Sequence, residues 1–96
     1  AKEWGRYGVT VNCVAFGLIG TRLGTIKSST TRVRIGGEDV SVGMNSDLHK
    51  DLQSRIPLGR VGTVEEAAGA VYLFCTPESD YISGQTVLCS GGLTSI

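Results

Sequence analysis

Residues 9–21 read Val-Thr-Val-Asn-Cys-Val-Ala-Phe-Gly-Leu-Ile-Gly-Thr, an apolar, valine-rich run that is closed by Gly17 and Gly20. A short β-branched run that ends at glycines is typical of a strand that is buried on both faces and followed by a sharp turn. We therefore expect Val9–Ala15 to form such a strand. In open α/β sheets ligands bind at the carboxyl ends of the strands, so the turn at Phe16–Thr21 is where we expect a site.

A second apolar run and a capped helix complete one structural unit with this strand. The run Gln85–Ser90 also ends at glycines and is predicted to be the parallel neighbour of the first strand. Thr63 and Glu66 have the spacing of a capping box, in which a hydroxyl and a carboxylate satisfy backbone donors at a helix start. Apolar residues then recur at helical spacing, which predicts a helix over Thr63–Cys75. The crossover rule places this helix on one face of the two strands, as in a βαβ unit.

The segment between the first strand and this helix is predicted to hold a loop, a hairpin and a short helix. Residues 22–31 are polar and have no periodicity, which is typical of a loop. Two alternating runs within residues 31–42 flank a pair of glycines, which is the signal for a β-hairpin. Asn45 or Ser46 can cap a following helix, and Pro57 requires that helix to end before it.

The composition argues against several classes of protein. Nine basic residues balance nine acidic ones, so no strong field recruits nucleic acid or an acidic membrane surface. The longest apolar runs fall far short of the roughly 20 residues that a membrane span needs. Three cysteines lie in apolar runs without metal-ligand spacing, so we expect no metal site. We expect buried free thiols in a reducing compartment; the alternative is a disulfide, which would leave one of the three cysteines unpaired. These features predict a cytoplasmic protein; the cysteines are Cys13, Cys75 and Cys89.

The first residues of the chain are typical of the end of a helix. Ala1–Gly8 resembles the last turns of a helix, with Gly8 in the left-handed position that follows it. No initiator methionine, N-cap residue or first helical turn precedes them. We therefore expect the 96 residues to be a piece of a longer chain.

The residues themselves do not identify a reaction. The chain has no Ser/His/Asp set and no phosphate-cradling glycine loop, and the run from Gly17 to Gly20 is too loose to be a dinucleotide fingerprint. Glu65 and Glu66 lie where carboxylates complement a helix dipole, which favours a structural role for both. Residue chemistry alone therefore predicts an α/β unit with a ligand-prone turn.

Four segments, in the same order, resemble the C-terminal part of the short-chain dehydrogenases/reductases, most nearly the 3-oxoacyl-carrier-protein reductase type. The match covers nearly the whole chain except residues 25–45. The resemblance implies a Rossmann-like, doubly wound parallel sheet, of which this chain would hold the last two strands, the substrate loop and the final helix. The matching segments are residues 4–15, 17–21, 56–66 and 81–86.

The resemblance also implies a cofactor site. Gly17, Ile19 and Thr21 match the family loop that holds the nicotinamide carboxamide of NAD or NADP, Ile19 through its backbone and Thr21 through its hydroxyl. A rigid glycine turn with one donor and one acceptor suits a neutral amide. The alternative is that the glycines only form the turn and that Thr21 only caps the next segment. Asn12 matches a mostly structural position, and Phe16 replaces the proline that the family usually has before Gly17.

No residue of this chain is offered as catalytic. The resemblance implies that the family's catalytic Ser, its Tyr-x-x-x-Lys pair and its phosphate-binding turn lie upstream of Ala1. In that case the chain is part of an NAD(P)-dependent oxidoreductase that reduces carbonyl compounds or oxidises alcohols. Residues 22–46 would then close over a small-molecule substrate.

The alternative function is a non-catalytic binding or assembly module. Such a module would dock through its exposed strand edge or through its last helix. The helix Thr63–Cys75 and the final strand resemble the family's tetramer contact surface, so we expect a homo-oligomer, either a dimer or a tetramer.

Overall fold

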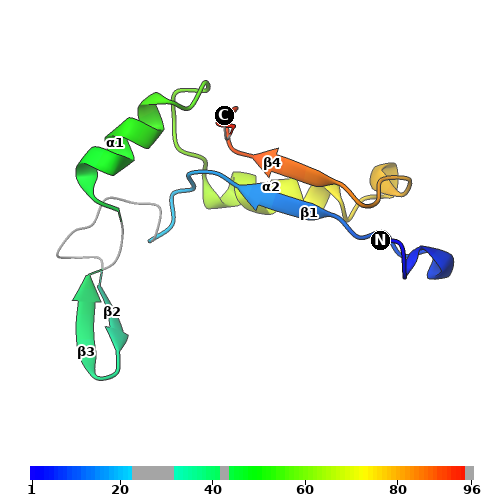
Figure 1. The fold of residues 1–96 in the computed structure, drawn as a ribbon, viewed down its shortest axis with the longest axis horizontal. Helices are drawn as coiled ribbons and strands as arrows, with labels where there is room; N and C mark the ends of the chain where they lie inside the picture. The colour runs from blue at the N-terminus through cyan, green and yellow to red at the C-terminus, as the bar shows by residue number, and fades with distance from the viewer. Residues whose placement is uncertain (23–31, 42–43, 95–96) are drawn as a thin grey trace.

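The computed structural model describes residues 1–22, 32–41 and 44–94, and its centre is a parallel pair of strands with one helix along it. Strand β1 (Cys13–Phe16) pairs in parallel with β4 (Thr86–Cys89). Helix α2 (Val64–Leu73) lies along one face of this pair (Figure 1). The capping box of α2 is present as predicted, and the arrangement confirms the expected α/β class.

The side chain of Asn12 joins the two strands where they begin. Its Nδ2 donates to the carbonyl of Ile82 at 2.9 Å, and its Oδ1 accepts the N–H of Gln85 at 3.1 Å. The N–H of Cys13 then donates to the carbonyl of Gln85 at 2.8 Å, which starts the ladder. Because one amide group fixes both backbone groups that precede β4, Asn12 has the structural role expected of it.

Strand β1 is shorter and more exposed than the sequence pattern predicts. It begins at Cys13 rather than at Val9, and the side chains at both of its ends are exposed. Val14 and Ala15 are only half-buried. The prediction of burial on both faces is therefore wrong for these 96 residues. The physical reason is that α2 covers one face and no other described element covers the opposite face (Figure 1).

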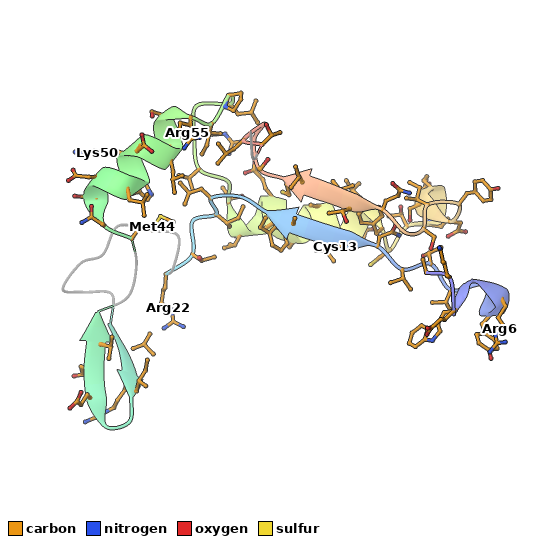
Figure 2. The ribbon with its side chains drawn as sticks, viewed as in Figure 1. Arg6, Cys13, Arg22, Met44, Lys50 and Arg55 are labelled. Atoms are coloured by element: carbon orange, nitrogen blue, oxygen red, sulfur yellow. The ribbon has the colours of Figure 1, made fainter. Side chains whose placement is uncertain are left out.

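The core lies beyond the end of the sheet, not within it. Among the described residues, the buried apolar side chains are Leu18, Ile19 and Ile56. The N–H of Leu58 donates to the carbonyl of Gly91 at 3.1 Å, so the segment after β4 joins the same cluster. The expectation of buried thiols is wrong: all three cysteines are free, two are exposed, and the third is half-buried. They are Cys13 (Figure 2), Cys75 and Cys89.

The predicted hairpin is present. Strands β2 (Arg32–Ile35) and β3 (Glu38–Ser41) pair in antiparallel fashion around Gly36 and Gly37. Both glycines have positive φ, 59° and 86°, which is the backbone that a two-residue type I′ turn requires. Figure 1 shows the hairpin standing apart from the β1–β4 pair and from α2.

Helix α1 (Ser46–Ser54) follows the hairpin and is capped as predicted. The side chain of Asn45 accepts the N–H of Asp47 at 2.9 Å. The other parts of the predicted substrate-loop region, residues 23–31 and 42–43, lie outside the described residues.

The first residues form a 3₁₀ turn over Gly5–Tyr7 in place of the predicted end of an α-helix. Gly5 and Gly8 flank this turn, and glycine is among the poorest formers of an α-helix. Gly8 follows with φ of 72°, in the left-handed conformation that was predicted for it. In the part of the chain that the structure describes, no helix is long and apolar enough to cross a membrane.

We predict that the 96-residue chain on its own associates through the free edge of β1. The N–H groups of Cys13 and Gly17 donate to the segment that contains β4, at 2.8 and 3.0 Å. Peptide groups alternate along a strand, so those of Val14 and Phe16 point to the opposite edge, where no described residue pairs with them. An unpaired edge beside apolar side chains is a template for association.

Sedimentation over a range of concentrations tests this prediction. We expect a mass above the 10.1 kDa of one chain, and thermal melting that depends on concentration. A compact monomer that melts cooperatively at low concentration would contradict it.

Candidate functional site

The turn that follows β1 lines an open cleft of about 410 Å³. The three residues that the sequence singled out, Gly17, Ile19 and Thr21, all lie along it. The cleft is therefore at the carboxyl end of a parallel strand, where α/β proteins bind ligands. Its other lining residues come from the same turn, from α2 and from the base of α1 (Figure 2): Phe16, Leu18, Val64, Ala67 and Met44.

Gly17 is the point of closest approach between the segments that follow β1 and β4. Its N–H donates to the carbonyl of Cys89 at 3.0 Å. A Cβ atom added to Gly17 would lie 2.8 Å from Cβ and 2.9 Å from Cα of Ser90, which is closer than carbon atoms pack. Glycine is therefore needed here for space, a requirement that is separate from the predicted cofactor role of Gly17 and from the alternative in which it only forms the turn.

Ile19 is fixed by a short parallel bridge to Gly62. The N–H of Gly62 donates to the carbonyl of Leu18 at 3.0 Å, and its carbonyl accepts the N–H of Gly20 at 2.8 Å. In trans peptides the N–H and C=O point in opposite directions, so the N–H and C=O of Ile19 both point away from Gly62. The C=O of Ile19 accepts the N–H of Thr21 at 2.7 Å.

The N–H of Ile19 has no hydrogen-bond partner among the described residues. Thr21 follows directly in the tight turn that its own N–H closes, and its side chain lies at the exposed rim of the cleft. The turn therefore presents a backbone donor and a hydroxyl within three residues of each other. Phe16, in the position where the resemblance leads us to expect proline, lines the same cleft.

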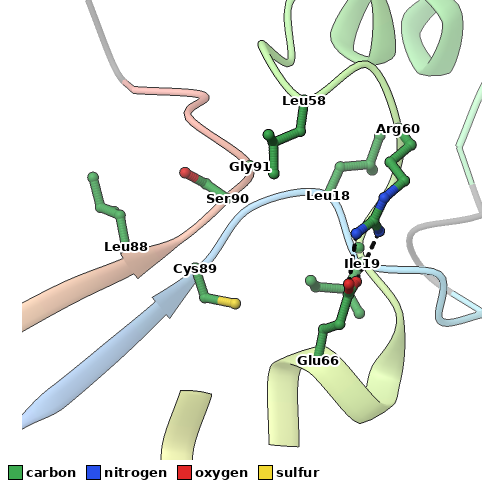
Figure 3. Close-up of a pocket in the computed structure, with 10 residues that line it drawn as sticks. Leu18, Ile19, Leu58, Arg60, Glu66, Leu88, Cys89, Ser90 and Gly91 are labelled. Carbon is green, nitrogen blue, oxygen red and sulfur yellow. Dashed lines mark hydrogen bonds and ion pairs between the residues drawn. The ribbon is translucent and has the colours of Figure 1, made fainter. Parts of the chain in front are cut away.

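An ion pair between Arg60 and Glu66 supports the segment that contains Gly62, the partner of Ile19 in the parallel bridge (Figure 3). Arg60 donates from Nη1 to Oε2 at 2.9 Å and from Nη2 to Oε1 at 2.6 Å. The Oε2 atom also accepts the N–H of Thr63 at 2.9 Å, and the N–H of Glu66 donates to Oγ1 of Thr63 at 3.1 Å. The Arg60 guanidinium, followed by the Thr63 N–H, lowers the pKa of the Glu66 carboxyl to about 2.

The sequence did not predict the parts that Arg60 and Gly62 have in this arrangement. Both lie in a glycine-punctuated turn within the matching segment 56–66, and the resemblance gave neither of them a role. The six-residue separation of Arg60 and Glu66 is not a helical spacing, so it gives no periodic signal. The available signal was the capping box itself, since a Glu at its third position has a second oxygen free for another donor.

The chain is similar to oxidoreductases along nearly its whole length. A family model described as enoyl-(acyl carrier protein) reductase matches residues 1–94. A tropinone reductase homologue from Arabidopsis thaliana is 42% identical over 94 residues, which are 98% of this chain and 26% of the relative. A 3-oxoacyl-[acyl-carrier-protein] reductase from Chlamydia muridarum is 33% identical over 97% of this chain and 31% of the relative. A cyclohexanol dehydrogenase from Rhodococcus is 37% identical over 98% of this chain and 29% of the relative.

A solved structure agrees with these sequence relatives. The crystal structure of a short chain dehydrogenase from Bacillus anthracis matches with a TM-score of 0.66 and 33% sequence identity. The match covers 99% of this chain and 32% of the bacterial chain. The chain thus spans about a quarter to a third of the length of the relatives that it matches.

Replacement of Gly17 by alanine is predicted to destabilise the protein. The added methyl group overpacks the contact with Ser90, and overpacking of this kind costs about 1–3 kcal/mol. Gly69→Ala is the matched control, because a Cβ there meets no atom within 4 Å and Gly69 lies inside α2. That control should stabilise the protein by about 0.5–1 kcal/mol. Free energies of unfolding from denaturant titration check both, and equal effects of the two variants would refute the role of Gly17.

The stabilisation by Glu66 is predicted to be lost only in strong acid. Because its folded pKa of about 2 lies below the ordinary 4.5, the contribution is complete above pH 4.5 and disappears as the pH falls toward 2. An NMR titration of the Glu66 carboxyl carbon should give a midpoint near 2, and Arg60→Gln should move that midpoint upward. A midpoint of 4.5 in the unaltered protein would show that the ion pair does not persist in solution.

Proposed function

Because the chain belongs to the short-chain dehydrogenase/reductase family, we propose that it forms the nicotinamide end of the cofactor site in an oxidoreductase. In this proposal the enzyme uses NAD or NADP to interconvert carbonyl compounds and alcohols, with a substrate of the 3-oxoacyl type. The observation that carries the proposal is the turn after β1, which brings Gly17, Ile19 and Thr21 to one cleft.

The groups of this turn fit a carboxamide. A carboxamide has an oxygen that accepts and an NH₂ group that donates. The N–H of Ile19 points away from Gly62 without a partner in residues 1–22, 32–41 and 44–94, so it suits the oxygen. The hydroxyl of Thr21 can accept from the NH₂ group. When bound, the reduced nicotinamide supplies a hydride to the carbonyl carbon of the substrate.

The remaining residues of the cleft orient the ring and exclude water. Gly17 leaves room at the point where the chain crosses Ser90, and apolar side chains from the turn and from α2 line the walls. Among the described residues, none that lines the cleft carries a carboxylate, imidazole, amine or thiol. Following the resemblance, we assign proton transfer to the family's catalytic residues, which lie outside this chain.

The proposal extends to the assembly of the enzyme. Tyr72 and Leu73 of α2 are 67% and 65% exposed, and Leu88 of β4 is 55% exposed. Large exposed apolar side chains mark contact surfaces, and α2 and β4 are the elements that resemble the tetramer contact of the family. We propose a cytoplasmic homo-oligomer, a dimer or a tetramer, that meets through this surface. The same exposed side chains favour the alternative function, a non-catalytic assembly module.

Protein purified from its natural source separates the two functions. Intact mass and oxidation of NADH or NADPH with carbonyl substrates are measured on the same sample. We predict a mass about three to four times the 10.1 kDa of this chain, as the length of its relatives implies, and protein-dependent oxidation. A mass near 10.1 kDa without oxidation would support the assembly module instead.

In the active oxidoreductase, Thr21→Val is predicted to lower kcat/KM by about two- to tenfold, the scale of one neutral hydrogen bond. The substitution keeps the shape of the side chain and removes its hydroxyl. Thr86→Val is the matched control, since Thr86 is exposed on β4 and does not line the cleft. Unchanged kinetics with both cofactors for Thr21→Val would show that Thr21 is only a turn residue.

A further inference from the structure

One carboxylate holds the backbone on both sides of Gly62. The guanidinium of Arg60 binds both oxygens of Glu66, at 2.9 and 2.6 Å, and the N–H of Thr63 binds one of them at 2.9 Å. Gly62 lies between Arg60 and Thr63 in the chain. Glu66 therefore restrains the residues before and after Gly62 through three charge-assisted hydrogen bonds.

Gly62 passes this restraint to the turn after β1. Both of its backbone groups are used, since its N–H binds the carbonyl of Leu18 and its carbonyl binds the N–H of Gly20. These two bonds fix the peptide planes on either side of Ile19. The contact is also close in space, because a Cβ on Gly62 would lie 2.9 Å from Cδ1 of Ile19.

We propose that Glu66 is a positioning residue for the cofactor loop, an inference that rests on the proposed function. Glu66 lines no part of the cleft that holds Gly17, Ile19 and Thr21. It acts through Gly62 and sets the direction in which Ile19 presents its N–H. Arg60 is the second member of this device, because it binds both oxygens of the carboxylate and shares Oε2 with the N–H of Thr63.

The ion pair is more than the capping box requires. A capping box is complete with the two hydrogen bonds between Thr63 and Glu66, and both are present. The bonds from Arg60 add nothing to the orphan donors at the start of α2. Their effect is to tie the segment before Gly62 to the helix, so loss of Arg60 is expected to loosen the bridge while the cap remains.

The positioning role predicts a selective defect. Ile19 is proposed to contact the nicotinamide end of the cofactor and not its adenosine and phosphate parts. Loosening Gly62 should therefore weaken binding of NADH or NADPH and lower kcat, and it should leave binding of ADP-ribose, which lacks nicotinamide, unchanged. A variant that merely destabilises the fold would weaken both ligands together.

Isothermal titration calorimetry of the active oxidoreductase with reduced cofactor and with ADP-ribose tests the proposal. If the enzyme prefers NADPH, 2′-phospho-ADP-ribose takes the place of ADP-ribose. We expect Arg60→Gln and Glu66→Gln to weaken binding of the reduced cofactor by about three- to tenfold, the scale of one lost hydrogen bond, with ADP-ribose within twofold. Arg60→Lys keeps the charge but not the two-pronged contact, so it should lie between Arg60→Gln and the unaltered protein.

Glu65→Gln is the matched control. It removes the same charge from the same first turn of α2, and Glu65 is outside the Arg60–Glu66–Thr63 cluster. Its binding of both ligands should equal that of the unaltered protein.

Two outcomes would overturn the positioning role of Glu66. A third outcome would refute the proposed function itself. Equal affinities for Glu66→Gln and Glu65→Gln, or parallel weakening of reduced cofactor and ADP-ribose in Arg60→Gln, would show a role in stability alone. Both leave the proposed function intact. Failure of the unaltered protein to bind either cofactor would instead refute the proposed function on which the inference rests.

Discussion

The bridge between Gly62 and the Leu18–Gly20 backbone joins segments that are far apart in the chain. One side continues β1, and the other leads into α2. The buried side chains of Leu18, Ile19 and Ile56 gather around this junction, whereas the strands themselves remain largely exposed. In the described residues the cluster at the end of the sheet is thus the best-packed part of the protein, and it coincides with the candidate site.

Features that depend on near neighbours in the chain could be predicted from the sequence. Thr63 and Glu66 are three residues apart, and the hairpin depends on Gly36 and Gly37, so local chemistry was enough. The burial of β1 was predicted wrongly because burial depends on which elements cover a strand. An apolar run is suited to two covered faces, and α2 supplies one.

The residues of the candidate site were predicted through the family resemblance, whereas the contacts that hold them are seen in the structure. Gly17, Ile19 and Thr21 were found through the resemblance, and the structure places them along one cleft. The restraint on Ile19 could not be predicted from the sequence, because it involves the backbone groups of Gly62, a residue without a side chain. Pairing between backbone groups that are remote in sequence is set by the fold, so it leaves no pattern along the chain.

The hairpin of β2 and β3 lies within residues 25–45, the stretch that the four matching segments leave out. Its strands pair with each other, and it stands apart from the β1–β4 pair (Figure 1). The entropic cost of closing a loop rises slowly with loop length, by about 0.6 kcal/mol for each doubling of the length. Evolution can therefore lengthen, shorten or exchange this insertion at little cost to the rest of the molecule. A change in the hairpin can therefore leave the backbone of the cleft at the end of β1 unaltered.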